Sequence, residues 1–250
     1  MTSTRAISNA TIVVVACGAA LVVLLIGAAQ IMRGPDVGSG PAFDAVRVVL
    51  EDGRSLQVQT REVTVSQWQA CHRAGLCTLD LSSNEKETDY PATGLNFPDA
   101  MEYIEWVNAT GPTAWRLPTA AEWSELAADV MPEAPDPTFT DPALKWASAY
   151  LTQASKTGRA LRPSSAFSKT SAGIDDLDGN VWEWTQDCYA GASGQGESMS
   201  IDRCPAFRLG GEHEAVMSFL VRDPARGGCA VGAPPAHLGV RLVSDWVEAS

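Results

Sequence analysis

The chain has 250 residues, and its 18 Lys and Arg residues face 30 Asp and Glu residues, which gives a formal net charge of −12. This excess of negative charge argues against binding of nucleic acid or of an anionic membrane surface through the folded part. The length fits one domain of about 200 residues with a short additional segment.

The first distinctive segment is residues 11–32, TIVVVACGAALVVLLIGAAQIM, which contains no charged side chain. An uncharged run of this length can cross a bilayer as one helix, whereas the apolar core of a signal peptide has about 7–15 residues. We therefore predict a transmembrane anchor at 11–32, preceded by a cytoplasmic tail at 1–10. Cleavage near the Ala28-Ala29 pair is the alternative, and the flanking arginines on both sides leave the orientation open.

A linker rich in Gly and Pro follows at residues 33–44, and the predicted folded domain spans 45–250. Ala45–Leu50 alternates between apolar and polar residues as a first strand does. Glu51–Arg54 is a turn signal, and Leu56–Val58 is expected to return as the second strand.

Three helices are expected in the middle of the chain. The first begins at Thr64, and the second, 97–107, is capped by Asn96. The third opens at Thr119, where Glu122 three residues later completes a capping box. In the second helix the expected buried stripe is Met101, Ile104 and Val107, with Trp106 at its margin. Residues 160–167 are expected to be extended.

Four cysteines are expected to form two disulfides. Cys71 and Cys77 bracket the end of the first helix at a spacing that differs from the CxxC of redox and zinc sites. Cys188 and Cys204 enclose a loop rich in Gly and Ser, and Cys229 is left unpaired. Two disulfides indicate an oxidising compartment, so we predict that the N-terminus is cytoplasmic and the domain periplasmic or extracellular.

The stretch 176–184, DLDGNVWEW, combines acidic, aromatic and turn-forming residues. One interpretation is a pair of core tryptophans beside an Asp-Gly turn. The other is a cation-binding loop, because Asp176 and Glu183 supply carboxylate oxygens and the irregular backbone supplies carbonyls, which are the ligands that Ca²⁺ requires.

The same stretch resembles the GNVWEW segment of the formylglycine-generating enzyme, or sulfatase-modifying factor, family. Further segments match that family in the same order, from about residue 45 to residue 243: Glu62–Trp68, Phe97–Ala100 with Trp106, Arg116–Trp123, Arg208–Gly211 and Leu238–Arg241. The resemblance implies a C-type-lectin-like α+β domain with much irregular chain, here joined to the predicted N-terminal transmembrane helix.

The resemblance also implies a structural calcium ion. The family ligands map onto the side chains of Asp176 and Glu183 and the backbone carbonyls of Gly179 and Val181, and we predict Ca²⁺ there. A second family calcium site departs from the pattern at Trp146–Ala149, and no second ion is expected.

Oxidase activity is not expected to carry over. Family enzymes use two cysteines shortly after the Gly-Gly pair to bind copper(I), for which thiolates are suitable ligands. In this chain no cysteine occurs between Pro205 and Gly228. A copper centre is therefore not expected.

The segment Glu212-His213-Glu214 stands where the family carries small and aromatic residues. A histidine between two acids could bind a transition metal, or the three residues could alternate along a strand with His on one face. Together with Trp182 they are the candidate cleft residues.

These observations lead to a membrane-anchored, exported domain that acts as a non-catalytic binding or accessory protein. Its partner would be a protein or peptide, membrane-associated or periplasmic, such as a (metallo)enzyme whose maturation it supports. The alternative is an oxidoreductase with altered metal-dependent chemistry, and the third hypothesis is a formylglycine generator that uses a different thiol.

Overall fold

The computed structural model describes residues 40–82, 88–131, 136, 138–144, 147–148, 151, 160–189, 201–212, 215–224 and 236–246. These residues lie in one compact unit, Ser39–Ser250. The predicted tail, the predicted anchor and most of the linker lie outside the described residues, as do His213, Glu214 and Cys229. Within the described ranges, no helix is long and apolar enough to cross a membrane.

The first sheet contains β1 (Ala45–Val49), β2 (Ser55–Gln59) and β7 (Val243–Asp245), in the order β1-β2-β7 with antiparallel pairing. The predicted hairpin of the first two strands is confirmed. The second strand reaches Gln59, which pairs with Ala45 in the ladder and is buried although it directly follows buried Val58.

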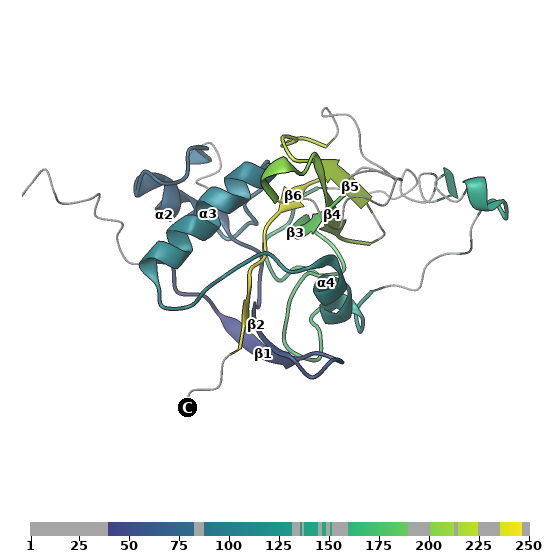
Figure 1. The fold of residues 1–250 in the computed structure, drawn as a ribbon, viewed down its shortest axis with the longest axis horizontal. Coiled ribbons are helices and arrows are strands. Elements are labelled where there is room, and N and C mark those ends of the chain that lie inside the picture. Colours follow the sequence, from purple (N-terminus) through teal and green to yellow (C-terminus); the bar gives the residue numbers. More distant parts are fainter. Residues whose placement is uncertain are drawn as a thin grey trace, which may run out of the picture. The chain divides into compact units, whose positions relative to one another are not determined.

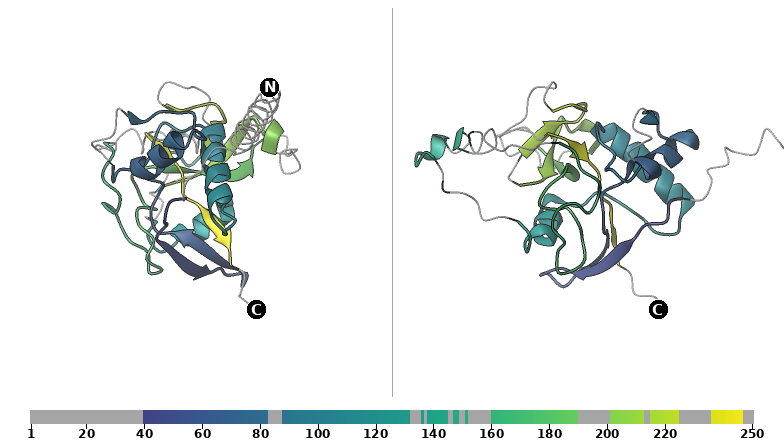
Figure 2. Two further views of the ribbon diagram at one scale, coloured as in Figure 1. Left: turned by 90° about the vertical axis from the view of Figure 1, so that its left-hand side faces the viewer. Right: turned by 180° about the vertical axis from the view of Figure 1, so that it is seen from behind.

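The second sheet contains β3 (Trp182–Cys188), β4 (Ala206–Gly210), β5 (Ala215–Ser218) and β6 (Leu238–Gly239), in the order β5-β4-β3-β6. Among these described strands β3 and β6 pair in parallel, and the other neighbours pair antiparallel. Figures 1 and 2 show β1 and β2 at one end of the domain and the second sheet toward the other. The chain between β6 and β7 runs from one sheet to the other.

The described residues form three main helices, α2 (Val65–Arg73), α3 (Phe97–Thr110) and α4 (Ala120–Ala127). Short 3₁₀ turns cover Pro142–Leu144 and Ile201–Arg203. Each main helix begins with a capping box, in the pairs Thr64 with Gln67, Asn96 with Asp99 and Thr119 with Glu122. The predicted starts are confirmed, because in each box a side chain satisfies backbone N–H groups that lack a helical partner.

The predicted buried stripe of α3 is wrong in part. Met101 is 36% exposed, whereas Trp106 is only 1% exposed. Neighbouring segments cover α3 on the side of Tyr103 and Trp106, whose rings lie 5.5 Å apart. The apolar pattern alone could not distinguish these two faces.

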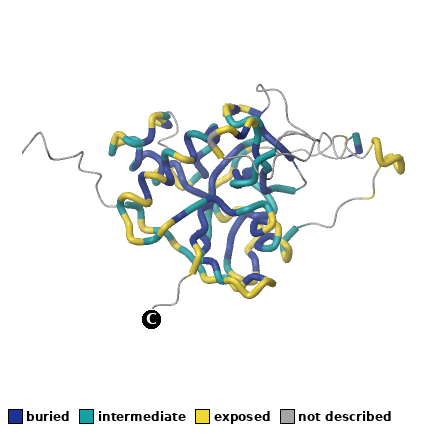
Figure 3. Tube along the Cα trace, viewed as in Figure 1, coloured by how far each residue is buried: buried dark blue, intermediate teal, exposed yellow. Residues whose placement is uncertain are grey.

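The main core is aromatic and lies between the helices and the second sheet. Trp68 of α2 stacks on Tyr103 of α3, and Phe97 stacks on Phe207 of β4. A smaller core packs the first sheet against Trp123 and Leu126 of α4. In Figure 3 the buried stretches gather in the middle of the domain.

Both predicted disulfides, Cys71–Cys77 and Cys188–Cys204, are present. The predicted extended segment at residues 160–167 is instead a loop with a turn at Ser164 and Ser165. Its backbone N–H groups donate to the Asp89 carbonyl and to the Asp176 carboxylate rather than to a strand, which explains the difference.

The Gly-Gly pair at the end of β4 allows two tryptophan rings to approach the backbone. A Cβ atom on Gly210 would overlap the ring of Trp123, and one on Gly211 would overlap the ring of Trp182. The pair therefore has a packing role, since the rings of Trp123 of α4 and Trp182 of β3 fill the space that side chains at these positions would need.

We predict that Gly210→Ala lowers the free energy of unfolding by about 1–3 kcal/mol, because the added methyl must displace the Trp123 ring. Urea denaturation followed by tryptophan fluorescence measures this change. Gly111→Ala is the matched control, since its Cβ would meet only the Val107 carbonyl at an ordinary 3.7 Å. Equal stability of the two variants would contradict the packing role.

Candidate functional site

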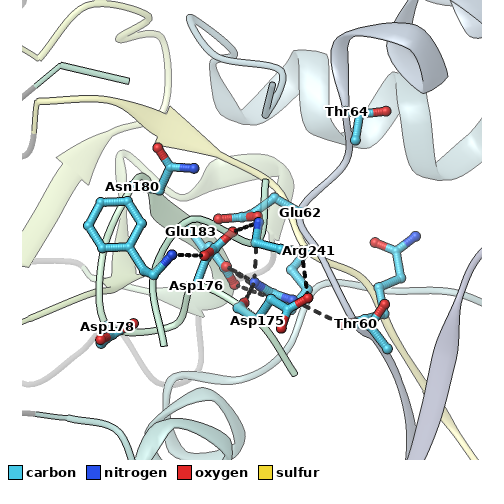
Figure 4. A network of polar contacts seen from close by, with 12 residues as sticks. Thr60, Glu62, Thr64, Asp175, Asp176, Asp178, Asn180, Glu183 and Arg241 are labelled. Carbon is cyan, nitrogen blue, oxygen red and sulfur yellow. Dashed lines mark hydrogen bonds and ion pairs between the residues drawn. The ribbon is translucent and has the colours of Figure 1, made fainter. Parts of the chain in front are cut away.

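A fully buried arginine, Arg241, is the centre of the polar network in Figure 4. It lies on the segment that joins β6 to β7. Its guanidinium contacts the Glu183 carboxylate of β3, with Nε–Oε1 at 3.0 Å and Nη2–Oε1 at 2.9 Å. Contact through two nitrogens holds both planar groups in a fixed orientation.

The same guanidinium donates hydrogen bonds to two other segments. Nη1 donates to the carbonyl of Gln59 at 3.0 Å, and Nη2 donates to the carbonyl of Asp175 at 2.8 Å. Arg241 therefore connects the end of β2, the loop before β3, and β3 itself. Burial alone would lower the pKa of Arg241, but Glu183 and Glu62 more than compensate and raise it.

Glu183 also receives a hydrogen bond from α4. Trp123 Nε1 donates to its Oε2 at 2.8 Å, and Arg241 Nε lies 3.2 Å from the same oxygen. Both carboxylate oxygens of Glu183 thus have donors from within the protein.

Asp176 organises the loop that leads into β3. Its backbone is in the left-handed region, with φ of 66°. Its carboxylate accepts the backbone N–H groups of Ser165 and Phe167, the latter at 2.8 Å. Burial raises the pKa of Asp176, and these two hydrogen bonds offset the rise only in part.

Glu62 is the least satisfied member of the network. Its side chain is buried, and neither carboxylate oxygen has a hydrogen-bond partner within the part of the chain that the structure describes. Arg241 Nη2 lies 3.9 Å from Glu62 Oε2. Burial raises the pKa of Glu62 to about 8, against the attraction of Arg241 and with the repulsion of Glu183 and Asp176.

The network therefore places three buried carboxyl groups, Glu62, Asp176 and Glu183, around one buried guanidinium. Unpaired buried charge is costly, so the folded state needs a proton or another cation to balance it. The raised pKa of Glu62 makes its carboxyl the site of that proton at neutral pH.

The four predicted calcium ligands are close in sequence but do not form a cage as arranged. Glu183 contacts Arg241 and Trp123, and the carbonyl of Gly179 accepts the Val181 N–H at 2.9 Å. Among the described residues, no group of three or more His, Cys, Asp and Glu side chains could hold a metal ion. The calcium ion stays a prediction, opposed by the contacts of Glu183 and favoured by the charge imbalance.

A cleft lies beside this network, between α4 and strands β3 and β4. Its volume is about 570 Å³. Its lining residues are Ala120, Ala121, Trp123, Ser124, Ala128, Met131, Asp187, Arg208, Leu209, Gly211 and Glu212. Of the predicted cleft residues only Glu212 lines it, because Trp182 is buried beneath Gly211, and His213 and Glu214 lie outside the described residues.

Sequence reasoning missed Asp187 and Arg208 in the cleft, and it gave Arg241 no role beyond a family motif. Asp187 accepts the N–H of Ala120 at 2.7 Å, and the Arg208 guanidinium lies 5.7 Å from the centre of the Tyr189 ring. An acid directly before Cys188 was the available signal, but its partner is 67 residues away in the sequence.

We predict that stability falls as pH rises from about 4.5 to about 8, because the folded state holds the Glu62 proton more tightly than the unfolded state, whose pKa is 4.5. The stabilisation that Glu62 supplies is fully present below pH 4.5 and is lost as the pH rises to about 8. Between these pH values the free energy of unfolding falls by up to about 1.4 kcal/mol per pH unit. Urea denaturation across this range measures it.

In Glu62→Gln the part of the slope that Glu62 contributes should disappear, since the neutral amide cannot titrate, whereas Asp176, whose pKa burial also raises, still titrates. Glu105→Gln, on the exposed side of α3, is the matched control and should keep the wild-type slope. An unchanged slope in Glu62→Gln would assign the titration to another group.

We further predict that millimolar Ca²⁺, compared with chelator, raises the melting temperature at pH 8 and has little effect at pH 5. A cation would supply at high pH the positive charge that the Glu62 proton supplies at low pH. Asp176→Asn should remove the response. Equal melting temperatures in chelator and in Ca²⁺ at both pH values would contradict calcium binding.

The comparisons with known proteins agree with this architecture. A model of the sulfatase-modifying factor enzyme 1-like domain matches residues 9–246. No match was found among curated proteins.

Three solved structures share the fold at low sequence identity. PvdO from Pseudomonas aeruginosa aligns with a TM-score of 0.51 and 16% identity, over 78% of this chain and 82% of that one. Treponema denticola variable protein 1 aligns with a TM-score of 0.51 and 17% identity, over 84% of this chain and 98% of that one. CarF aligns with a TM-score of 0.50 and 16% identity, over 82% of this chain and 99% of that one.

The family match covers nearly the whole chain and confirms the resemblance seen in the motifs. The structural matches show a shared fold and, at such identities, nothing about substrate or partner. The chain belongs to the family of sulfatase-modifying factor enzyme 1-like domains.

Proposed function

We propose that this protein is a membrane-anchored, exported accessory protein that binds a segment of a partner protein and does not oxidise cysteine. The observation that carries the proposal is the absence of any cysteine between Pro205 and Gly228, where the family enzymes hold their thiol pair. The scaffold around that segment is kept, since Gly210, Gly211 and Arg241 all have packing or hydrogen-bonding roles.

The two disulfides support an oxidising compartment, and the uncharged segment 11–32 supports a single transmembrane helix with a cytoplasmic N-terminus. In this proposal the C-type-lectin-like domain faces the periplasm or the exterior. The partner is then a protein of the same compartment, such as an enzyme whose maturation or activity needs support.

The alternative is an oxidoreductase with altered metal-dependent chemistry at Glu212-His213-Glu214. The described residues give this alternative no support, since two of its three side chains, His213 and Glu214, lie outside them. The accessory function is therefore the one the chain supports best.

The full-length protein, incubated with copper and oxygen, should leave the cysteine of a sulfatase-type peptide unchanged, because one thiol cannot form a bis-thiolate copper centre. Mass spectrometry of the peptide measures the conversion, with a two-cysteine family enzyme as the positive control. Turnover above that of a boiled sample would overturn the non-catalytic proposal.

The binding half of the proposal is tested by chemical cross-linking of intact membranes, followed by purification of the full-length protein. We expect one exported protein to be recovered in constant ratio, and to be absent after purification of an unrelated anchored domain. Recovery of no reproducible partner would contradict an accessory function.

A further inference from the structure

The cleft between α4 and the second sheet has the size and rigidity of a binding site. Its volume of about 570 Å³ falls within the range of roughly 300–1,000 Å³ for ligand pockets. Its floor contains Trp123, whose indole is held by the buried Glu183 carboxylate. The floor is therefore fixed by the same network that joins the two sheets.

One wall of the cleft is a helix face with small side chains. Ala121, Ser124 and Ala128 of this wall are all exposed, at spacings of three and four residues that place them on one side of the helix. Small side chains leave room for an extended backbone to approach the helix. Met131 at the end of this wall is an adaptable apolar contact.

The opposite wall is charged, and its charge is predominantly negative. Asp187 and Glu212 supply two carboxylates, and Arg208 supplies one guanidinium. Asp187 is held in place through the Ala120 N–H at 2.7 Å. The chain as a whole has a net charge of −12, so long-range attraction acts in the same direction as the local acids and favours a cationic partner.

We propose that this cleft binds an extended segment of the partner protein through a lysine or arginine side chain held by Asp187 and Glu212. The small-residue face of α4 receives the backbone of the segment, and the half-buried Met131 receives an adjacent apolar side chain. Arg208, at the rim over Tyr189, contacts a carbonyl or acidic group of the same segment. This inference rests on the proposed binding function and names the chemistry of the segment.

The test uses full-length protein immobilised in lipid nanodiscs and three pools of nine-residue peptides, with Lys, Glu or Leu fixed at the centre and the other positions randomised. Mass spectrometry measures retention. The Lys pool is expected to be retained at least tenfold more than the Glu pool. Equal retention of these two pools overturns the proposal.

Three variants locate the binding. Ser124→Trp fills the cleft from an exposed position and should reduce retention to background, whereas Ala109→Trp on the exposed side of α3 should not. Glu212→Lys should shift the preference from the Lys pool to the Glu pool. Retention that survives Ser124→Trp overturns the cleft assignment, and an unchanged melting temperature shows that each variant is folded.

The cross-linked partner separates this inference from the proposed function. If Ser124→Trp loses the peptides but still captures the partner from membranes, the accessory function stands and the cleft is not its binding site. If the wild-type protein captures no partner at all, the proposed function itself fails, whatever the peptides do.

Discussion

The buried pair of Arg241 and Glu183 is the interaction on which the rest of the structure depends. Glu183 lies in the second sheet, and Arg241 lies on the only described segment that passes from the second sheet to the first. Through the carbonyls of Gln59 and Asp175 and the indole of Trp123, the pair also holds β2, the loop before β3 and α4. Removing either partner would leave the other charge buried and unpaired, which typically costs about 3–5 kcal/mol.

The remaining imbalance in this network distinguishes it from a simple ion pair. Glu62 adds a third carboxyl group with no hydrogen-bond donor among the described residues, and burial, together with the nearby Glu183 and Asp176, raises its pKa. The network that fixes the fold is therefore also the part of the core most sensitive to protons and to added cations.

Some of this architecture could be predicted from the sequence because the determinants are local. Each capping box lies within four residues, and the first hairpin follows from one turn and an alternating pattern. The α+β fold was predicted from the motifs that this sequence shares with the family. The network could not be predicted, because Arg241 and Gln59 are 182 residues apart in the sequence, and nothing near Glu183 shows that an arginine rather than an ion contacts its carboxylate. The cleft was missed because Asp187 belongs to no motif, and because the Arg208–Gly211 motif does not show that Arg208 lies beside α4.

The order of the strands has a consequence for how the chain reaches its folded state. The first sheet needs β7, and the centre of the molecule needs Arg241, so residues near the end of the sequence complete contacts with residues near its beginning. Such long-range pairing forms late in folding. A chain synthesised from its N-terminus can build its helix starts early but cannot close its core until its last segment has emerged.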